Sequence, residues 1–77
     1  MNVNLADIMV HIDESLDLNQ LQTLEDAMRQ ENGVVAATAH DYAPHLMLVA
    51  YDPGRTTSLQ LLQRVSSRGL HGELIGL

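Results

Sequence analysis

The stretch that decides the fold runs from His11 to Gln20 and reads HIDESLDLNQ. It joins an alternating segment, Leu5 to Ile12, to a segment with helical periodicity, Asp17 to Glu31. Alternation of this kind predicts a strand with one face on a hydrophobic core. The two faces of that strand are Ile8, Val10 and Ile12 on one side, and Asp7, Met9 and His11 on the other.

The helix after this strand has a clear beginning in the sequence. Asp17 can cap its first turn, and Gln20 stands three residues later, which is the spacing of a capping box. Leu16 and Leu21 occupy the positions of a hydrophobic staple around that cap. The apolar stripe of the helix and its stop signal follow as Leu21, Leu24, Ala27 and Met28, and then Asn32-Gly33.

Two further strands are predicted, Val34 to Tyr42 and Leu46 to Tyr51. They are expected to join at Asp41 to His45, because Pro44 lacks an amide donor and fixes its own φ angle. Asp52-Pro53-Gly54 then forms a strong turn signal.

A second capping box, Thr57 with Gln60, predicts a second helix. Its apolar face is expected to hold Leu59, Leu62 and Val65, with Leu61 beside them. Gly69 would end this helix in the left-handed conformation, and His71 to Leu77 would form a last strand. The element order predicts an α+β fold over residues 1–77. This is the ferredoxin-like βαββαβ domain, a four-stranded antiparallel sheet with both helices on one face.

Composition excludes several classes of function. The formal net charge is −6 and there is no Lys, which argues against binding nucleic acid or an anionic membrane. The absence of Cys excludes disulfides and thiolate metal ligands. No secretory leader or membrane-spanning run is recognised, so a cytoplasmic protein is expected.

One strand has more apolar residues than a single buried face requires. Leu46 to Ala50 is apolar at every position, whereas the two helices cover only one side of the sheet. We therefore expect the open face, with Met9, Leu46 and Leu48, to dock on a second copy as a homodimer or on a partner protein. The alternative is a short apolar strand that is partly exposed.

Several segments resemble the heavy-metal-associated domain of copper chaperones and metal-transporting ATPases. They are Gly33-Val34, Val49 to Pro53, and Leu62 to Leu70. In that family a Cys-x-x-Cys motif binds Cu(I) or Zn, and it would fall on Asp17 and Gln20. The Met that usually precedes the motif would fall on Ser15, and the aromatic residue after the second helix on Leu70. The resemblance thus implies a domain that docks on partners of the same fold but lacks the thiol site.

The predicted topology brings all four histidines to one end of the sheet, together with three aspartates. These residues are His11, His40, His45 and His71, with Asp13, Asp17 and Asp41. Imidazole and carboxylate ligands suit Zn, Ni, Co or Cu(II). One hypothesis is therefore a metal site formed by His11, His71 and a carboxylate of Asp13 or Asp17. The alternatives are a pair formed by His40 and His45, a pH-sensitive end of the molecule, and solvated turn residues without a role.

No catalytic constellation is recognised. The His11–Ser15 loop has neither Gly nor Arg to cradle phosphate, and Ser15 lacks an evident oxyanion hole. Asp13 and Glu14 are consecutive and would diverge. The sequence predicts a non-enzymatic module for protein interaction or self-association, with no small-molecule substrate and no cofactor. The alternative is a metal-handling protein with the histidine and carboxylate site.

Overall fold

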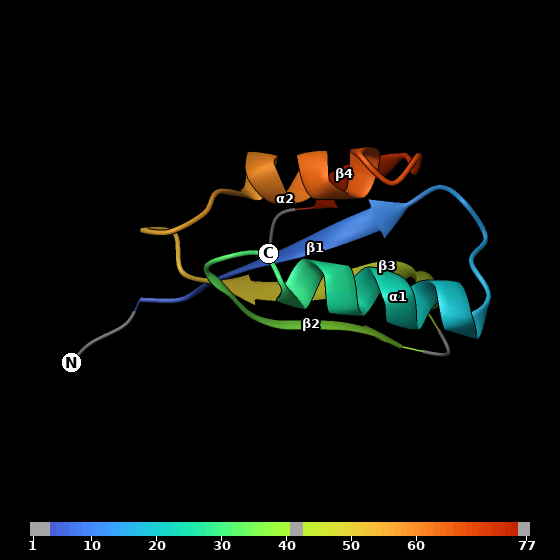
Figure 1. Cartoon of the computed structure of the whole chain (residues 1–77), viewed down its shortest axis with the longest axis horizontal. Coiled ribbons are helices and arrows are strands. Elements are labelled where there is room, and N and C mark those ends of the chain that lie inside the picture. Colours follow the sequence, from blue (N-terminus) through green and yellow to red (C-terminus); the bar gives the residue numbers. More distant parts are fainter. Residues whose placement is uncertain (1–3, 41–42, 76–77) are drawn as a thin grey trace.

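A computed structural model describes residues 4–40 and 43–75 of the chain. Two helices lie on one side of a four-stranded antiparallel sheet whose strand order is β2-β3-β1-β4 (Figure 1). The elements are β1 (Ala6–Ile12), α1 (Leu18–Arg29), β2 (Val34–His40), β3 (Ala43–Tyr51), α2 (Ser58–Ser66) and β4 (Gly72–Ile75). The predicted ferredoxin-like order is confirmed. Neither described helix has the length and apolar character needed to cross a bilayer.

The core lies between the sheet and the helices and is almost entirely aliphatic. Its largest fully buried side chains come from four elements: Val10, Ile12, Leu24, Met28, Met47, Val49, Leu61 and Val65. Each such side chain stabilises the fold by about 1.5–3 kcal/mol through removal of apolar surface from water. Leu, Ile, Val and Met thus fill an interior that contains no Phe or Trp.

Both predicted capping boxes are present. Asp17 Oδ1 accepts a hydrogen bond from the Gln20 amide at 2.8 Å, and Gln20 Oε1 accepts one from the Asp17 amide at 2.9 Å. The Thr57 and Gln60 pair repeats the arrangement at 3.1 and 3.3 Å. Each box satisfies two amides at a helix end that the helix itself leaves without acceptors.

The predicted start of the third strand is wrong. β3 begins at Ala43, so Pro44 and His45 lie within the strand and not in the connection. The pairing of β2 with β3 shifts register between Ala39 and His40. A proline without an amide hydrogen is tolerated at such an irregularity, because no regular ladder bond is required of it. The predicted connecting residue Asp41 lies outside the described residues.

The predicted buried face of the second helix is also partly wrong. Leu61 and Val65 are fully buried, whereas Leu59 is 60% exposed and Leu62 is half-buried. Leu61 and Val65 stand four residues apart, so they lie on one side of α2 and form its buried line. The predicted left-handed conformation of Gly69 is confirmed by its φ of +78°, although α2 itself ends at Ser66.

Candidate functional site

The histidine-bearing end of the molecule forms where β1 ends, β3 begins and β4 begins (Figure 1). The amide of Asp13 donates to the carbonyl of His71 at 2.9 Å. Nδ1 of His45 lies 2.7 Å from the carbonyl oxygen of Ile12. The rings of His11 and His45 stack, with centroids 5.9 Å apart and planes inclined by 19°. The predicted gathering of His11, His45 and His71 at one end is therefore seen; His40 ends β2, and its side chain lies outside the described part.

His71 is held by Glu14, a carboxylate that was not among the predicted metal ligands. Glu14 Oε2 lies 2.6 Å from Nδ1 of His71, and Glu14 Oε1 accepts a hydrogen bond from the His71 backbone amide at 2.7 Å. The hydrogen bond to the His71 side chain lowers the pKa of Glu14, and the same bond raises the pKa of His71. Glu14 thus ties the loop after β1 to the start of β4, across 57 positions of sequence.

His11 has a different neighbour. Its Nδ1 lies 3.3 Å from Asp13 Oδ1, within ion-pair distance. The two atoms do not have hydrogen-bond geometry, so this buried Nδ1 has no hydrogen-bond partner among the described residues. The ring as a whole is partly exposed.

The histidines and carboxylates therefore form two separate pairs, His11 with Asp13 and His71 with Glu14. Within residues 4–40 and 43–75, no three His, Asp or Glu side chains are placed to hold one metal ion. The structure does not bring the predicted ligands His11, Asp13 and His71 into one group. Asp17, the alternative carboxylate, is occupied by its helix cap.

The position of the missing thiol motif does not fit a soft metal ion. Asp17 and Gln20 supply only oxygen and amide atoms, and one oxygen of each already accepts a backbone hydrogen bond. Cu(I) prefers thiolate and thioether ligands. The chain has no cysteine to provide them.

The open face of the sheet carries a continuous row of uncharged side chains. In register across the four strands lie Thr38, Leu48, Met9 and Ile75. Leu48 is 38% exposed and Ile75 is 41% exposed, whereas Met9 is half-buried. The predicted residue Leu46 lies on the next row, opposite His11. Ile75 was missed because its face depends on the register of β4 with β1, which the sequence did not specify.

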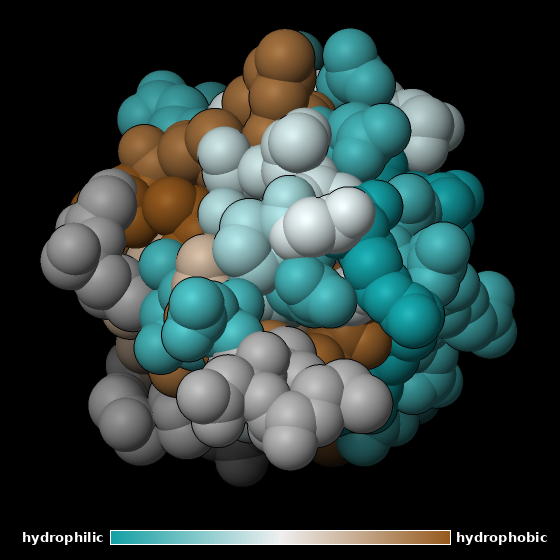
Figure 2. Space-filling model, turned by 90° about the vertical axis from the view of Figure 1, so that its left-hand side faces the viewer, coloured by the Kyte–Doolittle hydropathy of each residue, from teal (hydrophilic) through white to brown (hydrophobic). Residues whose placement is uncertain are grey.

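Seen from the end of the molecule that carries the Asp52–Thr56 turn, the surface is divided (Figure 2). Hydrophilic residues cover the right of this view, whereas hydrophobic residues gather at the top and on the left.

Comparison with known proteins identifies the fold. No family model and no curated protein matches the sequence. Among solved structures, the copper-binding domain of a P-type ATPase superposes with a TM-score of 0.82 at 18% identity, covering 91% of this chain and 93% of that one. Oxidised MerP from Ralstonia metallidurans gives 0.82 at 13% identity, with coverage of 92% and 97%. The CopZ metallochaperone gives 0.79 at 15% identity, with coverage of 88% and 100%.

The chain is thus a small α+β domain of ferredoxin-like topology. Its fold is that of the heavy-metal-associated domains, as the resemblance implied, and it has this fold without the two cysteines.

Proposed function

We propose that this domain is a non-enzymatic cytoplasmic module that associates with a second copy of itself through the open face of its sheet. The observation that carries the proposal is the uncharged row of Thr38, Leu48, Met9 and Ile75. Contiguous apolar surface on a small domain is typical of an interaction site, and small aliphatic cores commonly gain stability by association.

The edge of the sheet at β2 is a poor alternative for association. The free edge of a strand normally offers unpaired amides and carbonyls to another strand. Here Glu25 Oε2 accepts from the Ala39 amide at 2.8 Å, and Arg29 donates to the Ala37 carbonyl at 2.8 Å. Side chains of α1 therefore occupy the β2 edge, which disfavours strand addition at this edge.

A second copy fits the face because the polar side chains of β1 would face one another as imidazole and carboxylate. On β1, Asp7 and His11 lie on the open face at equal distances on either side of Met9. A two-fold axis along the uncharged row would place His11 of each copy over Asp7 of the other. The same operation would place Leu46 over Ala50 on β3. This packing would place an imidazole against a carboxylate at the rim around an apolar centre, and a polar rim around an apolar core is the usual anatomy of an interface.

The test is sedimentation velocity of the 8.5 kDa chain from about 10 to about 500 µM, a range that spans weak association. We expect a concentration-dependent shift from monomer to dimer. Leu48→Asp should abolish the shift, because it would bury an unpaired charge at the centre of the interface. Leu59→Asp is the matched control: Leu59 is more exposed than Leu48 but lies on α2, on the other side of the sheet. A wild-type monomer throughout the range, or equal loss with both variants, would refute self-association through this face.

A second candidate function, a metal site of histidine and carboxylate ligands, stays a prediction. The buried Nδ1 of His11, which lacks a hydrogen-bond partner in the described part of the chain, is the observation that favours it. Zn or Ni would have to draw His71 away from Glu14 to reach His11 and Asp13 together. Titration with ZnCl2 followed by NMR tests this: saturable shifts at both His11 and His71 support the site, and unchanged histidine resonances contradict it.

A further inference from the structure

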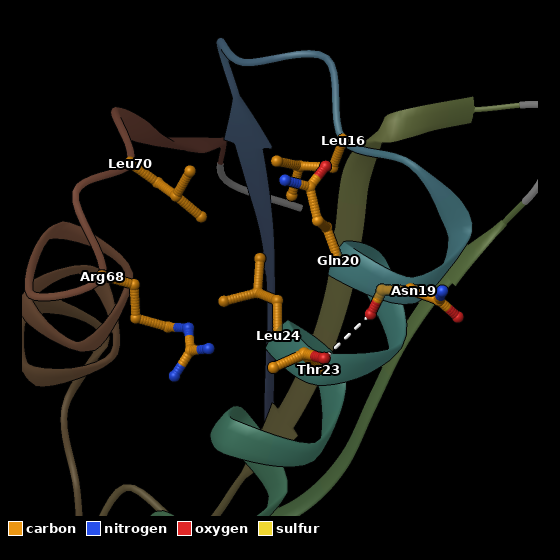
Figure 3. Close-up of a pocket in the computed structure, with 7 residues that line it drawn as sticks. All are labelled: Leu16, Asn19, Gln20, Thr23, Leu24, Arg68 and Leu70. Atoms are coloured by element: carbon orange, nitrogen blue, oxygen red, sulfur yellow. Dashed lines mark hydrogen bonds between the residues drawn. The ribbon is translucent and has the colours of Figure 1, made fainter.

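A cavity of about 240 Å³ lies between the first turns of α1 and the segment that follows α2 (Figure 3). Its lining combines apolar and polar side chains: Leu16, Leu24 and Leu70, with Asn19, Gln20, Thr23 and Arg68. The cavity is distinct from the open sheet face, because α1 and α2 cover the opposite side of the sheet.

Arg68 differs from the other three arginines of the chain. Each of the others lies within ion-pair distance of a carboxylate: Arg29 with Asp26, Arg55 with Asp52 and Arg64 with Glu31. Arg68 has no such partner among the described residues. In Figure 3 its guanidinium extends from the end of α2 towards Leu24 and Thr23. In a domain with a net charge of −6, this is a cation directed into a cavity without an acid to neutralise it.

A second donor and an apolar surface accompany this cation. Gln20 uses its side-chain oxygen in the helix cap, so its amide nitrogen is left to donate elsewhere. Figure 3 shows that nitrogen on the side facing Leu70. Leu24 is buried at the base of the cavity, and Leu16 and Leu70 are half-buried beside it. The cavity therefore offers charged and neutral donors next to a hydrophobic surface.

We propose that this cavity binds a small aliphatic monocarboxylate, with its carboxylate on Arg68 and its chain against Leu16, Leu24 and Leu70. A guanidinium forms strong, directed hydrogen bonds with a carboxylate. A cavity of about 240 Å³ is large enough for a short-chain carboxylate such as hexanoate. This binding does not depend on self-association, since it uses the helical side of the domain.

The test is an NMR titration of the ¹⁵N-labelled chain with sodium hexanoate, up to about 20 mM, as suits a millimolar dissociation constant. We expect saturable amide shifts that centre on Leu16, Thr23 and Leu70. Hexan-1-ol has the same chain but no charge, and it should bind at least about tenfold more weakly. If hexanol binds equally well, or if hexanoate gives no saturable shift, the proposal is wrong.

Two variants and a control localise the effect. Arg68→Gln removes the cation from an exposed position and should weaken hexanoate binding at least about tenfold. Leu70→Phe enlarges a lining side chain, fills part of the cavity and should block binding. Arg55→Gln is the matched control, because it also removes a surface cation but lies by the Asp52–Thr56 turn, away from the cavity. Equal weakening by Arg55→Gln and Arg68→Gln would show a general charge effect and overturn the site. The ¹⁵N spectrum of each variant also reports whether it is folded.

Discussion

Asp17→Ala tests the claim that the position of the lost thiol motif now serves to cap a helix. The substitution removes the 2.8 Å hydrogen bond from the Gln20 amide and leaves that amide at the helix start without its acceptor. Loss of such a cap costs about 1 kcal/mol, within a range of about 0.5–2 kcal/mol. For a domain of this size, 1 kcal/mol corresponds to a fall of about 4–8 °C in melting temperature.

The assay is thermal unfolding followed by circular dichroism, at one fixed protein concentration because association raises the apparent stability. Asp17→Asn is the control, since its side-chain oxygen can still accept the bond, and it should stay near wild type. Thr57→Ala provides an internal comparison: its box has longer bonds, of 3.1 and 3.3 Å, and threonine is a weaker cap, so the loss should be smaller. If Asp17→Ala unfolds at the wild-type temperature, or if Ala and Asn lose equally, the capping account is refuted.

Three other changes have defined outcomes. The Glu14–His71 pair should stabilise the fold most between about pH 4.5 and 6.5, which are the ordinary pKa values of the two groups. The pKa of Glu14 is lowered in the folded protein, so its contribution to stability is lost as the pH falls through that folded value. The pKa of His71 is raised in the folded protein, so its contribution is lost as the pH rises through that folded value. The urea midpoint of His71→Gln should therefore differ most from wild type in that window, and a difference that grows towards alkaline pH would contradict the pairing. Gly33→Ala should cost more stability than Gly69→Ala, although both glycines have a positive φ. A Cβ at Gly33 would lie 2.8 Å from Cβ of Arg55, whereas a Cβ at Gly69 would meet nothing within 4 Å. Equal melting temperatures of the two variants would count against this expectation. Met28→Ala should lower the free energy of unfolding by about 2–5 kcal/mol in urea titrations, because the side chain is fully buried, and a loss below about 1 kcal/mol would show that the core around it is not close-packed.

The parts of the fold that the sequence predicted depend on local chemistry. Both capping boxes and the turn at Asp52 require only residues within a few positions of one another, so spacing was sufficient to find them. The start of β3 was missed because it depends on a register shift near Ala39, and ladder register is a property of two strands together.

The candidate site was harder to predict for the same reason. The sequence could place His11, His45 and His71 at one end of the sheet, since topology alone determines which loops meet there. It could not select Glu14 as the partner of His71, because that choice depends on side-chain reach between a loop and a strand 57 positions apart. Glu14, which was weighed only as half of a catalytic carboxylate pair, therefore holds a histidine that was expected to bind a metal.

The most direct test of self-association through the open sheet face is an isotope-filtered NOE experiment on an equimolar mixture of labelled and unlabelled chains. We expect intermolecular NOEs among the methyl groups of Met9, Leu48 and Ile75, and none from the exposed Leu18 and Leu59 of the two helices. Intermolecular NOEs from the helical residues, or none at all at concentrations where the chain sediments as a dimer, would contradict it.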